Sequence, residues 1–177
     1  MGTTVVIFIA VALAVLLLLA ARQPDTFAVS RSLRIGATPE LLFSHINDLR
    51  AMNRWNPFVQ QDPGLQGSYS EPAGGPGARY TFQGRKAGTG AISITSTRPP
   101  SQVLMELSMT KPMACANRIE FTLQPVAGGQ TEVTWGMSGR AIFLSKVICV
   151  FMSMDKMVGK PFEQGLQQLK AIAEAKA

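Results

Sequence analysis

Hydrophobic and polar positions divide the chain into stretches of different period. Residues 3–21, TTVVIFIAVALAVLLLLAA, carry neither charge nor proline. At ~1.5 Å of rise per residue, a helix of this length reaches roughly the ~30 Å of a bilayer's hydrocarbon core. The pattern predicts a transmembrane anchor over residues 1–22, a polar linker over 23–26, and one domain over 27–177.

A cleaved signal peptide is the alternative for the apolar stretch, because small residues occur in "LAARQ". The anchor is favoured because no Lys or Arg precedes the run, which is longer than the usual ~7–15 apolar residues of a signal peptide. Arg22, Arg31 and Arg34 follow the segment. The positive-inside rule therefore favours a single-pass membrane protein with a cytoplasmic domain.

Alternation of apolar and polar residues predicts a series of β-strands after the linker. Turn signals rich in Gly and Pro separate the strands, and "PVAGGQ" predicts a hairpin. Such consecutive strands favour an antiparallel meander. The expected strands span residues 27–35, 79–83, from 89 onward, 102–109, 118–124 and 131–138.

Two short helices are expected after the first strand. Thr38 suits an N-cap, Pro39 the first helical position, and Asp48 the cap of the second helix. Pro57 disfavours helical dihedrals at the preceding residue, so the second helix is expected to stop near Trp55.

Apolar residues recur at steps of three and four from Ala141 to the C-terminus, which predicts one long helix. Pro161 should kink or break this helix, and Gly159 should ease the bend. The long helix is the element able to cover the apolar face of a curved sheet. The space between them is where a pocket would form.

The segments "FAVSRSLRIGATPELLFSHINDLRAMNRWNPF" and "MDKMVGKPFEQGLQQLKAIAE" together resemble the polyketide cyclase and dehydrase-like group of the START-like, or SRPBCC, superfamily. The resemblance covers residues 27–174. It implies the α+β helix-grip fold (START/Bet v 1-like), with about six or seven strands. The superfamily includes lipid-transfer proteins, hormone binders, cyclases and chaperone activators, so the resemblance does not identify a reaction. Met52 stands where related sequences often carry an aromatic residue.

The net charge of +6 does not indicate nucleic-acid binding, because the Lys and Arg residues are scattered along the chain. A basic surface near anionic lipid headgroups is the favoured interpretation. Cys115 and Cys149 lack metal-ligand spacing and read as small buried hydrophobes. We expect neither a metal nor a cofactor.

Inward-facing positions of the strands and helices supply the candidate pocket. Trp135 is the strongest, because a buried indole N–H needs a hydrogen-bond partner. Trp55 and Phe58 either pack at the exit of the second short helix or form the pocket rim. Methionine suits a cavity for irregular apolar ligands, although it also fills gaps in cores. The pocket-lining candidates are Trp55, Phe58, Tyr80, Phe82, Met105, Met109, Phe121, Trp135, Met137, Phe151, Met154 and Val158.

Candidate catalytic residues are few. The sequence shows no Ser-His-acid arrangement, clustered carboxylates or phosphate-binding glycine motif. His45 is the sole histidine, and Arg31 either points inward toward an acidic ligand group or reaches the solvent at the rim. We expect membrane-anchored binding of a hydrophobic small molecule or lipid. A cyclase or dehydratase-like enzyme, and a structural envelope protein with a vestigial cavity, are the alternatives.

Overall fold

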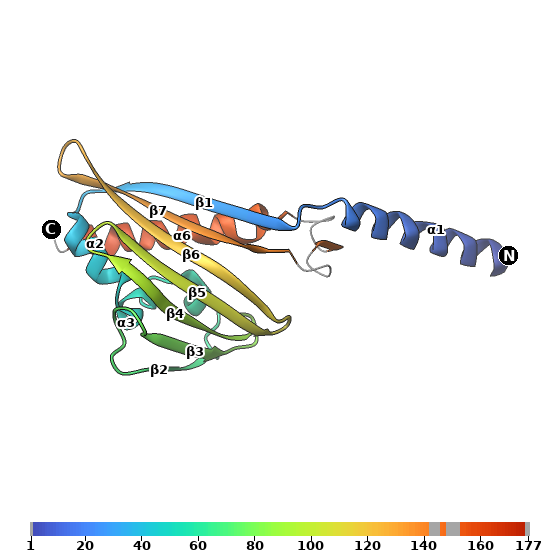
Figure 1. Ribbon diagram of the computed structural model, residues 1–177, viewed down its shortest axis with the longest axis horizontal. Coiled ribbons are helices and arrows are strands. Elements are labelled where there is room, and N and C mark those ends of the chain that lie inside the picture. Colours follow the sequence, from blue (N-terminus) through green and yellow to red (C-terminus); the bar gives the residue numbers. More distant parts are fainter. Residues whose placement is uncertain (1, 142–145, 148–152, 176–177) are drawn as a thin grey trace.

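A computed structural model describes residues 2–141, 146–147 and 153–175 of the chain. The strands form one antiparallel sheet in the order β1-β7-β6-β5-β4-β3-β2 (Figure 1). Their bounds are β1 Thr26–Ile35, β2 Gln66–Tyr69, β3 Arg79–Gln83, β4 Thr89–Arg98, β5 Gln102–Lys111, β6 Cys115–Val126 and β7 Gln130–Arg140. The described helices are α1 Gly2–Ala21, α2 Pro39–Ile46, α3 Leu49–Met52, α4 Pro57–Gln60 and α6 Met154–Glu174.

The sheet confirms the predicted α+β helix-grip architecture. Strands β2 to β7 follow one another as a meander, and β1 closes the order by pairing with β7, with Thr26 opposite Arg140. Gly128 and Gly129 adopt positive φ in the β6–β7 turn, where glycine avoids the steric cost of that conformation. Register shifts between β4 and β5 bend the sheet locally. The short strand β2 was not predicted from the sequence.

The short helices differ in part from the prediction. The Thr38 hydroxyl accepts from the Leu41 N–H at 3.4 Å, and the Asp48 carboxylate caps α3, as expected. However, α3 ends at Met52 rather than near Trp55. Pro57 does not merely stop a helix: it is the first residue of α4, which Asn56 caps by accepting from the Phe58 N–H at 3.1 Å.

The prediction of one long helix from Ala141 was wrong at its start. Helix α6 begins at Met154, because Ser153 adopts an extended backbone and its hydroxyl caps the Lys156 N–H at 3.3 Å. Residues 142–145 and 148–152, which the prediction also placed in this helix, lie outside the described residues. The helix continues through Pro161, so the proline does not end it.

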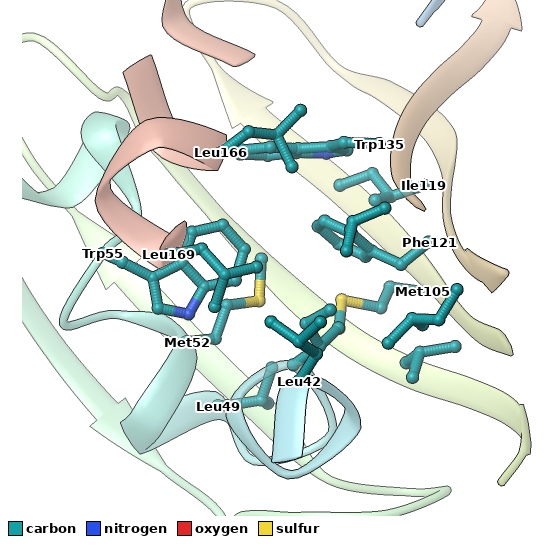
Figure 2. Close-up of a cluster of buried hydrophobic side chains, with 14 of the residues drawn as sticks. Leu42, Leu49, Met52, Trp55, Met105, Ile119, Phe121, Trp135, Leu166 and Leu169 are labelled. Carbon is teal, nitrogen blue, oxygen red and sulfur yellow. The ribbon is translucent and has the colours of Figure 1, made fainter. Parts of the chain in front are cut away.

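The hydrophobic core lies between the sheet, α6 and the short helices. Phe162, Leu166 and Leu169 of α6 are fully buried against the sheet, and burial of such a side chain stabilises the fold by about 1.5–3 kcal/mol. Figure 2 shows Leu166 above Trp135, with Leu42 and Leu49 of the short helices filling the other end of the cluster.

Helix α1 projects away from the end of the domain where β1 begins (Figure 1). Its stretch Thr4–Ala21 is long and apolar enough to cross a membrane. A signal sequence near the N-terminus can have the same length and composition, so these two features do not separate the two. The apolar side chains along this helix are exposed, among them Phe8, Ile9 and Leu18. Helix α1 therefore contributes little to the core of the domain.

Candidate ligand-binding site

An apolar cavity of about 140 Å³ lies between the sheet, α4 and the first half of α6. It approaches the ~150 Å³ of a cavity that holds benzene and is smaller than the ~300–1,000 Å³ of drug-sized pockets. In this conformation the space suits one ring or a short hydrocarbon segment. Its walls are Met52, Asn56, Phe58, Val59, Leu65, Tyr80, Phe82, Ala87, Ile92, Leu107, Met109, Ile119, Trp135, Met137, Val158 and Phe162.

Trp135 of β7 forms a closely packed wall of the cavity. Its ring stacks on Phe162 of α6 with centroids 4.2 Å apart and an interplanar angle of 11°. The ring of Trp55 lies edge-on to that of Trp135, with the two ring centroids 5.6 Å apart. Helix α6 approaches this closely because residue 165 is glycine: a Cβ there would lie 2.7 Å from Trp135 Cζ3. The indole is therefore fixed on several sides.

The Nε1–H of Trp135 has no hydrogen-bond partner among the described residues, although the side chain is only 2% exposed. An unpaired buried donor costs about 1–3 kcal/mol. By contrast, the Nε1–H of Trp55 donates to the His45 carbonyl at 3.2 Å. Trp135 thus offers one unused donor within a largely apolar wall.

Tyr80 is the one titratable side chain among the cavity-lining residues that the structure describes. Burial raises the pKa of its phenol, with a smaller contribution from Tyr69, whose ring centroid is 4.6 Å away. At neutral pH the phenol stays protonated, so it suits hydrogen bonding better than general-base catalysis. Within the described residues, no group of His, Cys, Asp and Glu side chains is placed to hold a metal.

Asp62 organises the turn between β3 and β4 beside the cavity. Its Oδ2 accepts from the backbone N–H groups of Lys86 and Ala87 at 2.8 and 3.0 Å. These bonds lower the pKa of the Asp62 carboxyl, with a further contribution from Gly64. Asp62 is itself buried, while Leu65 and Ala87 beside it line the cavity. One carboxylate therefore holds a wall of the cavity in place.

Arg31 of β1 fastens the beginning of α6 to the sheet. Its Nη1 and Nη2 donate to the two Asp155 carboxylate oxygens at 2.8 and 3.0 Å, and its Nε to Glu163 Oε1 at 2.6 Å. Gly159 leaves room for the guanidinium, because a Cβ there would lie 2.2 Å from Arg31 Nη2. Arg31 therefore pairs with helix α6 rather than lining the cavity.

The residues expected to line a pocket fall into several groups. Phe58, Tyr80, Phe82, Met109, Trp135, Met137 and Val158 lie on the cavity wall. Trp55, Met105 and Phe121 are buried in the filled part of the core. Met154 lines a separate hollow beside the linker, and Phe151 lies outside the described residues. His45, in α2, is not among the lining residues.

The list of pocket candidates omitted the lining residues Met52, Asn56, Val59, Leu65, Ala87, Ile92, Leu107, Ile119 and Phe162. Among these, Val59, Leu65 and Ala87 come from α4 and from turns. Turn residues show no periodicity, so no sequence signal pointed to them. A larger hollow of about 550 Å³ lies on the sheet near β2, β3 and β4. It is open and lined largely by polar or small residues, such as Ser68, Thr81 and Gly90, so it does not enclose an apolar ligand.

Comparison with known proteins agrees with this architecture. Residues 26–174 match the family model described as "Polyketide cyclase / dehydrase and lipid transport". A comparison with curated proteins gives no match.

Solved structures support the fold at low sequence identity. Protein jhp0584 from Helicobacter pylori is 8% identical with a TM-score of 0.65, covering 86% of this chain and 90% of its own. Protein Ms6760 from Mycobacterium smegmatis is 16% identical with a TM-score of 0.58, covering 88% and 96% respectively. Ara h 8.0201 is 12% identical with a TM-score of 0.55, covering 82% and 99%. With the family model matching most of its length, the chain belongs to the polyketide cyclase / dehydrase and lipid transport family.

Proposed function

We propose that the protein is a membrane-anchored binder of a hydrophobic molecule, held in the cavity between the sheet and α6. The observation that carries the proposal is the unpartnered, buried Nε1–H of Trp135 in an apolar wall. A ligand with an apolar body and one acceptor oxygen would satisfy both features. The family's description as lipid transport supports the ligand class.

Burial of apolar surface would supply most of the binding free energy, at about 25 cal/mol per Å² before association costs. The cavity of about 140 Å³ would receive one end of a longer ligand, so the remainder would extend beyond the cavity. The apolar helix α1 supports anchoring of the chain in a membrane.

Fluorescence of a chain with one tryptophan tests this proposal. The chain contains two tryptophans, so Trp55→Phe leaves Trp135 as the sole emitter. A brominated alkyl ketone that enters the cavity should quench this emission, and the quenching should saturate at one ketone per protein. Trp55 is a suitable residue to replace, because its own N–H is already bonded and it does not line the cavity.

Trp135→Phe measures the contribution of the donor, with Trp55→Phe as the matched control. Loss of one hydrogen bond should weaken binding of the ketone about two- to tenfold and leave binding of the equally long bromoalkane much less affected. Calorimetry gives both affinities.

Two negative results together would contradict the proposal and favour the vestigial cavity. The ketone would not quench the emission, and no lipid could be extracted from the protein after purification from its host. Chemical conversion of an extracted ligand on incubation would favour the cyclase alternative.

A further inference from the structure

The end of the domain that carries α1 is also its cationic end. Antiparallel pairing puts Thr26 opposite Arg140 and Thr89 opposite Lys111, so the start of β1 lies at the same end as the β3–β4 and β5–β6 turns. Figure 1 shows both turns on the side from which α1 departs. Exposed basic residues at this end are Arg22, Arg85, Lys86, Lys111, Arg140 and Lys156.

The carboxylates near this end do not cancel these charges. Asp25 pairs with Lys146, Asp155 pairs with Arg31, and Asp62 is buried against backbone N–H groups. At the opposite end of the domain, several cations are paired within the fold: Arg34 with Glu132, Arg50 with Glu71 and Lys170 with Glu174. Arg79 and Arg98 are exposed at that end and make no ion pair among the described residues. More unpaired positive charge therefore lies beside α1 than at the opposite end.

Partly exposed residues of the cavity lining lie toward this same cationic end. Ala87 belongs to the β3–β4 turn, Met109 is near the end of β5, and Val158 is in the first turns of α6. Met157 adds an apolar side chain that is 42% exposed. Basic residues and the partly exposed part of the apolar lining thus lie at the same end of the domain.

The linker keeps this end close to α1. Residues 22–25 separate Ala21 from Thr26, a span of at most about 18 Å when fully extended. The linker is also tied to the domain, because the Asp25 carbonyl accepts from the Ala141 N–H at 2.8 Å. A helix α1 that crosses a bilayer would hold the cationic end within reach of the headgroups.

From this arrangement we propose that the six basic residues bind the headgroups of anionic phospholipids and turn the partly exposed part of the cavity lining toward the bilayer. This inference rests on the anchoring in the proposed function. Each basic residue near an anionic surface strengthens attraction about fivefold, and the effect decays over a Debye length of about 10 Å. The ligand would then pass between cavity and bilayer without crossing much water.

Hydrogen exchange of the full chain in lipid nanodiscs tests the inference. One nanodisc contains phosphatidylcholine alone, and the other contains phosphatidylcholine mixed with phosphatidylglycerol. Exchange in residues 84–88 and 111–114 should slow at least about fivefold in the anionic nanodisc, and added salt should reverse the effect. Exchange in the β6–β7 turn, at the opposite end, should be unchanged.

Charge reversal separates specific docking from general attraction. Arg85→Glu with Lys111→Glu should abolish the protection. Arg54→Glu with Arg98→Glu makes the same change in net charge away from the two turns and should retain it. Equal exchange in both nanodiscs, with the chain fully inserted, would contradict the proposed docking to headgroups but not the proposed anchoring by α1. Failure of the chain to insert would overturn both.

Discussion

Single residues decide how closely α6 approaches Trp135. Gly165 is buried, and a Cβ there would lie 2.7 Å from Trp135 Cζ3 and 3.0 Å from Pro57 Cδ. The indole cannot move aside easily, because it is stacked on Phe162 and lies 5.1 Å from the Phe121 ring centroid. A glycine in mid-helix, which costs about 1 kcal/mol relative to alanine, is thus retained for packing.

Gly165→Ala should lower the free energy of unfolding by up to about 2 kcal/mol, because the overpacking cost of about 1–3 kcal/mol is offset in part by a gain of about 1 kcal/mol in helix propensity. Urea unfolding measures the difference. Gly136→Ala is the matched control, because the nearest atom to its Cβ would be at an ordinary 3.7 Å. A Gly165→Ala protein as stable as the wild type would show that α6 can shift away from the indole.

Among the helices and strands, features that depend on one segment were predicted from the sequence, and contacts between segments were not. Thr38 and Asp48 were predicted as caps, because each bonds within three residues of itself. The start of α6 was missed, since the apolar period continues before Met154 and Ser153 gave the sole local sign of a boundary. Asp62 accepts a hydrogen bond from the backbone N–H of Lys86, which lies 24 residues away, and no local sequence pattern indicates this contact.

Asp62→Asn should destabilise the β3–β4 turn above about pH 4, the unfolded pKa of aspartate. Because the folded pKa of Asp62 is lowered, its stabilising effect is present above that pH and is lost as the pH falls through the folded pKa. The thermal midpoints of the wild type and the variant should therefore converge at acid pH. Scanning calorimetry between neutral and acid pH measures this.

Glu106→Gln serves as the control at neutral pH, since the Glu106 side chain is exposed and bonds to the neighbouring Ser108 hydroxyl. It should leave the thermal midpoint nearly unchanged. A difference between the wild type and Asp62→Asn that persists at acid pH would mean that side-chain shape, rather than charge, holds the turn.

At the scale of the whole molecule, one apolar helix is joined to a domain that has its own core. The buried residues of the core cluster lie between Ile35 and Ala173, outside α1. The proposed membrane attachment and the proposed ligand binding would therefore be separable properties, in α1 and in the domain respectively.

Retention of α1 predicts that the protein resists alkaline extraction from its host's membranes and that its intact mass includes residues 2–21. The physical reason is the burial of an apolar helix that spans about 27–30 Å. Mass spectrometry of the membrane fraction measures this directly. A mature chain that begins after Ala21 and is found in the soluble fraction would establish a signal peptide instead.

The apolar N-terminal helix follows from the sequence alone, because an uninterrupted apolar run marks it. Most of the antiparallel strands and the body of the C-terminal helix follow from it too, because their apolar residues recur with the period of a strand or of a helix. The sequence also marked Trp135 and Met137 as inward-facing. Which of the inward residues line a cavity depends on the packing of the segments, since Trp55 and Phe121 also face inward and yet lie in the filled core.

Tertiary structure also decided the pairing of Arg31 with Asp155, 124 residues away, and the lack of a partner for the Trp135 N–H. Both depend on where α6 meets the sheet. A cavity is the volume that packed side chains leave unfilled, and a donor is unpaired when no acceptor lies within hydrogen-bonding distance of it. Neither property belongs to any one segment, so both arise only when the segments come together.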